Sequence, residues 1–230
     1  WQPANTPLTL DSSAFALTAQ GKVRGDGDFI FYNQTTLSGG GIQRAGDGRT
    51  FTVNFSALPA AIERIVIALT IDQGQRRGQS FGQLNQVRAE IRAAGHETPL
   101  AIFSLATKMM PETALIVGEM YRRGGEWKFR AVGQGFVGGL GPLAQQYGVD
   151  VADDPDAGAA PSPASPPVAA RPALAPSSAA PPPAKPIRLE KITLEKKGSS
   201  ISLEKTGQGF DELVVNLNWH QGGGGKGFFG

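Results

Sequence analysis

The chain has 230 residues, of which 40% are hydrophobic and 18% charged, and it contains no cysteine. This composition is typical of a globular protein, and the lack of cysteine excludes disulfides, thiol catalysis and zinc–thiolate sites. The formal net charge is only +2 and no basic stripe occurs, which argues against nucleic acid as a partner. No apolar run of roughly 18 residues is present, so no transmembrane helix is expected.

Residues 1–151 predict a mainly β fold. Alternation of apolar and polar residues indicates half-buried strands, and the nearly continuous apolar run Ile65–Ile71 indicates a central one. Turn-forming residues separate the strands at short intervals, which favours an antiparallel β-sandwich. Short helices are expected at Ala57–Glu63 and Pro142–Tyr147. The expected strands are Leu8–Leu10, Ala14–Leu17, Phe29–Tyr32, Phe51–Phe55, Ile65–Ile71, Val87–Ala93, Leu100–Leu105, Thr113–Tyr121 and Trp127–Ala131.

The first loop is rich in oxygen-bearing side chains. Asp26 and Asp28 alternate with Gly25 and Gly27, and the glycines suit a tight turn. The apolar run Phe29–Tyr32 then predicts a strand buried on both faces. Carboxylates presented from a loop beside a rigid strand are one way to bind a hard cation such as calcium. The other interpretation is an Asx-type turn that leads into a core strand.

The composition changes sharply after this first part. Residues 152–186 hold eleven of the 17 prolines, mixed with alanine and serine, which predicts a disordered linker. Short alternating runs come next at Ile187–Leu189, Ile201–Leu203 and Leu213–Trp219, and the glycine-rich segment Gly222–Gly230 predicts a flexible tail.

Sequence patterns that carry catalysis are weak. The run Gly133–Gly138 satisfies G-x-G-x-x-G, but no crossover helix comes after it, so tight turns are the better interpretation. The two histidines, His96 and His220, lie in unlike settings, and no nucleophile–histidine–carboxylate arrangement is visible. Enzyme activity is therefore not expected. Two arginine pairs, at 76–77 and 122–123, leave open an anion- or metabolite-binding module.

Several motifs in one order carry a family resemblance over residues 8–151. The chain resembles the TerD-like tellurium-resistance and stress proteins at Leu10–Phe15, Asp26–Asn33, Arg77–Gln83, Thr113–Tyr121 and Gly125–Phe136. The resemblance implies a non-catalytic, cytoplasmic β-sandwich that binds calcium through acidic loops and acts with other tellurite-resistance and stress proteins. Peripheral membrane association stays open.

The resemblance also implies site residues. Asp11, Asp26, Asp28 and Asn33 match the first acidic cluster of the family, and Asp47 matches the start of a second acidic loop. Here the sequence departs from the family, because the next residues enter a strand instead of continuing through several acidic positions. Calcium prefers six to eight oxygens, so a loop with Asp47 alone is not expected to hold a fully coordinated ion.

The C-terminal part carries a second resemblance. Ile201–Lys205 and Phe210–Trp219 are similar to the opening strands of the same fold, and Trp1 aligns with Trp219. We therefore expect a fragment of a tandem-domain protein: residues 1–151 as a domain without its opening strands, 152–186 as linker, and 187–230 as the opening strands of a second domain. These strands are expected to complete the first sandwich, within one chain or by strand exchange between chains.

The favoured interpretation is a stress-response module that binds calcium, or a similar divalent cation, and acts through protein partners. A structural or scaffolding domain with degenerate metal sites is the first alternative. An anion- or metabolite-binding module, which uses the two arginine pairs, is the second.

Overall fold

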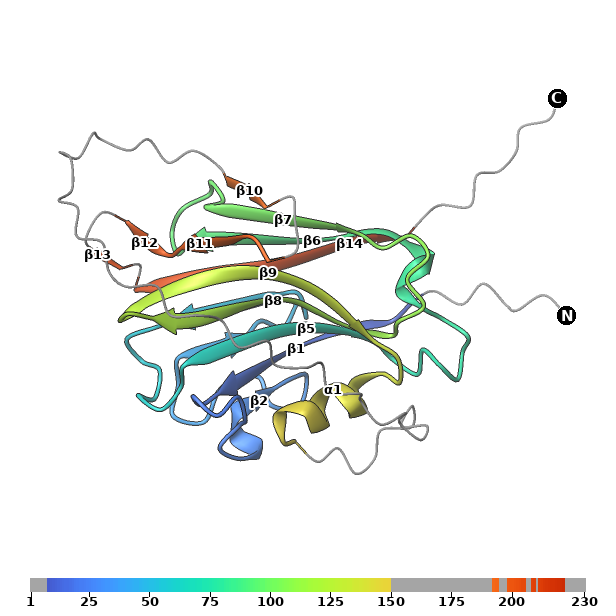
Figure 1. Ribbon diagram of the computed structural model, residues 1–230, viewed down its shortest axis with the longest axis horizontal. Coiled ribbons are helices and arrows are strands. Elements are labelled where there is room, and N and C mark those ends of the chain that lie inside the picture. Colours follow the sequence, from blue (N-terminus) through green and yellow to red (C-terminus); the bar gives the residue numbers. More distant parts are fainter. Residues whose placement is uncertain (1–7, 150–191, 195–197, 206–207, 210, 222–230) are drawn as a thin grey trace, which may run out of the picture.

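Two six-stranded sheets pack face to face in the computed structural model, which describes residues 8–149, 192–194, 198–205, 208–209 and 211–221 (Figure 1). The first sheet, sheet A, has the order β11-β9-β8-β5-β1-β2. Its strands are β11 (Ser200–Ser202), β9 (Glu126–Phe136), β8 (Ala114–Arg123), β5 (Arg64–Ile71), β1 (Leu10–Leu17) and β2 (Phe29–Ile30). This arrangement confirms the predicted mainly β fold with two antiparallel sheets.

The second sheet, sheet B, has the order β10-β7-β6-β14-β4-β3. Its strands are β10 (Ile192–Leu194), β7 (Ala101–Ala106), β6 (Leu84–Ala93), β14 (Glu212–Gln221), β4 (Thr50–Asn54) and β3 (Ile42–Arg44). All pairs are antiparallel except β10 with β7. The remaining elements are the hairpin of β12 (Glu204–Lys205) with β13 (Gln208–Gly209), the 3₁₀ turns η1 (Asp26–Asp28) and η2 (Phe81–Gln83), and the helix α1 (Leu140–Tyr147).

Apolar side chains fill two layers. The main core lies between the sheets and includes Phe51, Ile67 and Leu217. A second cluster lies on the other face of sheet A, where Val66 of β5 packs with Leu143 of α1. Both faces of β5 are therefore covered, which explains why Ile65–Ile71 reads as an unbroken apolar run.

Strand β14 lies in the middle of sheet B although it comes from the C-terminal part of the chain (Figure 1). It pairs with β4 on one side and with β6 on the other. Its alternation places Leu213, Val215 and Leu217 in the main core. The ring of Trp219 lies beneath the guanidinium of Arg49, 4.1 Å from the ring centroid. Without β14, β4 and β6 would both present unpaired edges.

Two predicted elements are wrong. Ala57–Glu63 forms turns rather than a helix, because Glu63 bonds through its backbone to Leu17 and Arg122 and is thus drawn toward sheet A. The expected strand Phe29–Tyr32 is only the two-residue β2, because Phe31 and Gln34 exchange backbone hydrogen bonds in a turn. Tyr32 is accordingly 60% exposed.

Other expected elements need smaller adjustments. The predicted strands Leu8–Leu10 and Ala14–Leu17 are replaced by the single strand β1, which starts only at Leu10 and continues to Leu17. The helix predicted at Pro142–Tyr147 is confirmed as α1, which starts two residues earlier and ends at the left-handed residue Gly148. The linker 152–186, the run Ile187–Leu189 and the tail 222–230 lie outside the described residues.

Candidate metal site

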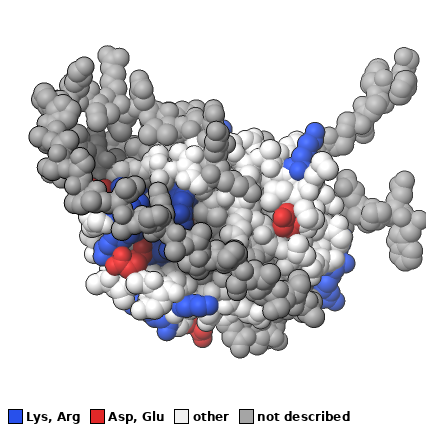
Figure 2. All heavy atoms as spheres, viewed as in Figure 1, with Lys and Arg blue, Asp and Glu red and all other residues white. Residues whose placement is uncertain are grey.

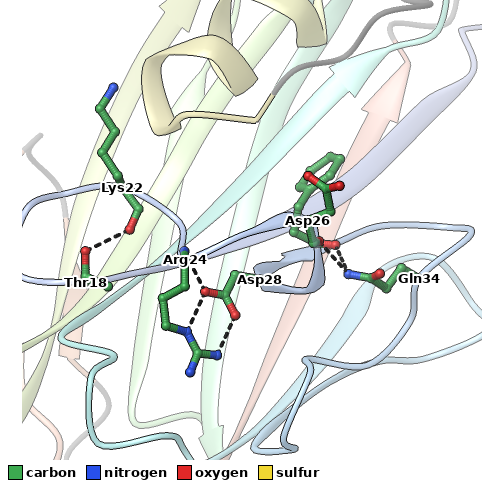
Figure 3. A network of polar contacts seen from close by, with 7 residues as sticks. Thr18, Lys22, Arg24, Asp26, Asp28 and Gln34 are labelled. Atoms are coloured by element: carbon green, nitrogen blue, oxygen red, sulfur yellow. Dashed lines mark hydrogen bonds and ion pairs between the residues drawn. The ribbon is translucent and has the colours of Figure 1, made fainter.

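Asp28 is a buried carboxylate held by an arginine (Figure 3). The backbone N–H of Arg24 donates to Asp28 Oδ2 at 2.9 Å, and Arg24 Nε donates to the same oxygen at 2.8 Å. Arg24 Nη2 donates to Oδ1 at 2.6 Å. Both carboxylate oxygens are therefore engaged by one residue, and the ion pair with Asp28 raises the pKa of the Arg24 guanidinium.

Asp26 and Asn33 both lie on the surface. Asp26 is exposed, and its carboxylate lies apart from that of Asp28 in Figure 3. Its backbone carbonyl accepts a 2.9 Å hydrogen bond from the Gln34 amide, which also donates to the Phe29 carbonyl at 2.7 Å. Asn33 is exposed in the turn after β2. Gln34 thus fixes the loop through backbone atoms.

Asp11 lies in β1, and the side chain of Arg44, in β3, lies beside it. The Arg44 side chain is only 8% exposed, and its Nη2 lies 3.5 Å from Asp11 Oδ1. Arg44 Nε donates to the carbonyl and to Oγ of Ser12, each at 3.1 Å. Burial raises the pKa of Asp11, the Arg44 charge opposes this rise, and the charge of Asp72 adds to it. Arg44 is therefore a buried cation among negative groups.

Asp47 folds its carboxylate back onto its own loop. Oδ1 accepts the backbone N–H groups of Arg49 at 2.8 Å and Thr50 at 2.9 Å, and Oδ2 accepts the Thr50 hydroxyl at 2.6 Å. Burial opposes ionisation, but these hydrogen bonds and the charge of Arg44 together lower the pKa of Asp47. The carboxylate thus acts as the acceptor of an Asx-type turn.

Arg44 influences both Asp11 and Asp47: its Nη2 lies 3.5 Å from Asp11 Oδ1, and its charge favours the ionised form of each carboxyl. Ser12 Oγ donates to the Gly48 carbonyl at 2.8 Å, which ties the Asp47 loop to β1. A Cβ at Gly48, whose φ is +67°, would lie 3.0 Å from Arg44 Nη2, so this glycine allows the loop to close over the arginine. Arg44 therefore lies close to the Asp11 side chain and to the backbone of the Asp47 loop.

Asp28 does not join this group. Strand β1 pairs Phe15 with Phe29, so Asp28 is level with Ala16, five residues along β1 from Asp11. At about 3.3 Å per residue this separation is about 17 Å. Among the described residues, no group of three or more histidine or acidic side chains has the spacing of a metal site. The arrangement does not fit a calcium shell of six to eight oxygens.

The sequence interpretation missed the two arginines that hold these carboxylates. Arg24 precedes Asp28 by four residues, a spacing that could have suggested the pair. Arg44 gives no such signal, because its contact with Asp11 depends on how β3 packs beside β1. Asp72, which acts on Asp11 through its charge, was also missed.

The two arginine pairs lie at opposite ends of sheet A and do not form one anion site. Arg77 pairs with Asp72 at 3.4 Å, beyond the end of β5. Arg122 pairs with Glu63 at 3.7 Å, close to the start of β5, and its guanidinium lies 5.4 Å from the Trp127 ring centroid. In the part of the chain that the structure describes, no helix is long and apolar enough to cross a membrane.

Known proteins share this sequence pattern. The family model of the TerD domain matches residues 1–147. The chain is 42% identical over 152 residues to the tellurium resistance protein TerD of Serratia marcescens, a match that covers 62% of this chain and 79% of that protein. It is also 42% identical over 153 residues to general stress protein 16U of Bacillus subtilis, with 62% and 78% covered.

A longer match is found in the tellurium resistance protein TerA of an Alcaligenes species. The two are 36% identical over 203 residues, which is 87% of this chain. The chain spans about half of TerA, since the match covers 53% of that protein. The domain match and these relatives agree, and the chain belongs to the TerD domain family of tellurium-resistance and stress proteins.

Proposed function

We propose that this chain is a non-catalytic structural module of tellurite and stress resistance, in which arginine side chains take over the role of the metal in the acidic loops. It acts by association with other resistance proteins, in the cytoplasm. The family supports the resistance role, because its relatives are named for tellurium resistance and general stress. The absence of catalysis, the partners and the location are predictions.

One observation carries the proposal. Of the carboxylates that the family resemblance implies as ligands, Asp28 is fully engaged by Arg24 and Asp11 faces Arg44. A guanidinium supplies a positive charge and several donors in a fixed plane, so it can satisfy carboxylates without a metal ion. Asp47 is in turn engaged by its own loop.

Binding of calcium, or of a similar divalent cation, is the second candidate. Asp11 and Asp47 are both influenced by the single guanidinium of Arg44, so the two negative charges outnumber the one positive charge between them. Asp11 is partly exposed, with 43% of its side chain accessible. A cation from solvent would then reach Asp11 and Asp47 from outside.

A survival assay separates the two candidates. A strain that lacks this protein and is sensitive to tellurite is complemented with the wild-type chain or with the double variant D26N/D47N. Both changed residues are exposed family-implied ligands, and asparagine at 47 retains an acceptor for the turn. We expect the double variant to restore resistance fully. Loss of resistance by a variant that still melts at the wild-type temperature would favour the cation instead.

A further inference from the structure

A polar cavity of about 360 Å³ lies beside α1 on the outer face of sheet A. Its wall is formed by strands β5, β8 and β9 and by the last residues of α1. The lining residues with charged or polar side-chain groups are Arg64, Glu119, Arg130, Gln134, Gln146 and Tyr147. None of the acidic residues Asp11, Asp26, Asp28 and Asp47 lines this cavity, although the first loop adjoins its wall, because the backbone N–H of Val23 donates to the Tyr147 carbonyl at 3.0 Å. A ligand bound there would be held by residues other than those of the proposed function.

The alternation of the strands explains why polar groups gather here. Val66, Glu119 and Arg130 lie side by side across β5, β8 and β9. The outer face of sheet A is apolar where α1 covers it and becomes polar beside the end of this helix. The pairing of β8 shifts register near Ile116 and Gly118, and such bulges redirect side chains next to binding sites.

Positive charge exceeds negative charge in this cavity. The Glu119 side chain is only 8% exposed, and it pairs with Arg130 and, at 3.8 Å, with Arg64. Each arginine side chain is 45% exposed. Lys22 does not line the cavity, but its Nζ donates to the backbone carbonyl of the lining residue Gln146 at 2.7 Å. Figure 2 shows that basic and acidic side chains lie close together at the left of the molecule in this view.

The arginines keep donors for a ligand. A guanidinium carries five N–H donors, and among the described residues the only hydrogen bond from the guanidinium of Arg64 or Arg130 is that of Arg130 to Glu119. Glu119 thus orients both side chains without using their full donor capacity. The guanidinium of Arg130 also lies 5.5 Å from the Tyr121 ring centroid, which limits its motion.

Tyr147 adds a neutral donor. Burial raises the pKa of its hydroxyl to about 12, the charge of Glu119 contributes to the rise, and the charge of Arg64 opposes it. The hydroxyl therefore stays protonated at neutral pH and can donate a hydrogen bond without adding negative charge.

We propose that this cavity binds a small oxyanion or carboxylate, held by Arg64 and Arg130 and accompanied by the Tyr147 hydroxyl and the amides of Gln134 and Gln146. Planar guanidinium groups match the geometry of carboxylate and phosphate oxygens. Glu119 is a positioning residue that holds the two arginines in place before the ligand arrives.

Calorimetric titration of the whole chain tests the site with two probes at constant ionic strength. Inorganic phosphate represents free oxyanions, and malate represents small carboxylates. We expect saturable binding of at least one probe. The probe that binds more tightly shows whether the natural ligand is an oxyanion or a carboxylate. We expect Arg130→Gln to weaken binding at least tenfold, whereas Arg88→Gln has no effect. Arg88 is a matched control, because it is 42% exposed and paired with Glu90 at 2.7 Å on sheet B.

A second variant distinguishes loss of binding from loss of folding. Gln134 is exposed and lines the cavity outside the ion pairs of Glu119 with the arginines, so Gln134→Glu adds a negative charge and leaves the fold intact. We expect this variant to melt like the wild type and to bind the probe more weakly. Binding of neither probe by the wild type, or equal binding by the wild type and both cavity variants, would overturn the proposal.

Discussion

Burial of Asp28 depends on a single neighbouring side chain. The Asp28 side chain is 3% exposed, and within the part of the chain that the structure describes Arg24 supplies the three hydrogen bonds that its carboxylate accepts. Removing one member of such a pair leaves a charge that is both desolvated and unpaired. The buried carboxylate of Asp28 therefore stabilises the first loop only together with Arg24.

Arg24→Ala is expected to lower the free energy of unfolding by about 2 kcal/mol, because only the backbone N–H of residue 24 would still serve Asp28. Urea denaturation measures this change. Arg76→Ala, in an exposed loop, is a comparison variant for loss of a surface arginine. A change of less than about 0.5 kcal/mol in Arg24→Ala would show that the pair is not needed.

Asp47→Ala is expected to cost about 1 kcal/mol, because three hydrogen bonds that organise its loop are lost. The folded-state pKa of Asp47 lies below the ordinary value of 3.8. Its contribution is therefore present above the ordinary pKa and is lost as the pH falls through the lower folded-state pKa. Melting curves of wild type and variant should converge in acid, and a difference that stays constant down to the lowest pH at which the protein folds would contradict this assignment.

At the scale of elements, alternation in the sequence was the most reliable guide. Leu213, Val215 and Leu217 predicted a strand with one dry face, and β14 has this face in the core. Helix Ala57–Glu63 was predicted wrongly because backbone bonds to sheet A, which no local pattern records, override its local preference. The contact of Arg44 with Asp11 was likewise invisible, since it joins strands from two different sheets.

The central position of β14 predicts unequal effects of substitutions along it. Leu217→Ala should destabilise the protein by about 3 kcal/mol, because it leaves a cavity in a fully buried layer. Val214→Ala, on the half-buried outer face, should cost less than about 1 kcal/mol. Thermal and urea unfolding compare the two. Equal small effects would mean that β14 does not pair between β4 and β6 in solution.

For the whole molecule, the described residues form a sandwich with charged groups in two separate places. At the family-implied acidic positions, Asp28 pairs with Arg24 and Asp11 pairs with Arg44. In the cavity beside α1, Glu119 instead pairs with two arginines, which retain donors for a ligand. The sequence pointed to the acidic positions and to the family. The pair of Arg24 with Asp28 could have been suggested by their spacing. The contact of Arg44 with Asp11 could not, because it depends on how strands of the two sheets pack together.

Arg44 places a positive charge beside Asp11 that also acts on Asp47, and its role in place of a metal ion can be tested directly. The measurement is the melting temperature of the wild type and of Arg44→Ala, each in excess calcium and in EDTA, with Arg88→Ala as the control. A ligand that binds only the folded state raises the melting temperature. We predict no calcium-dependent rise for the wild type or the control, and a rise of several degrees for Arg44→Ala, whose carboxylates lose their cation. A rise of several degrees in the wild type, unchanged in Arg44→Ala, would contradict this role of Arg44.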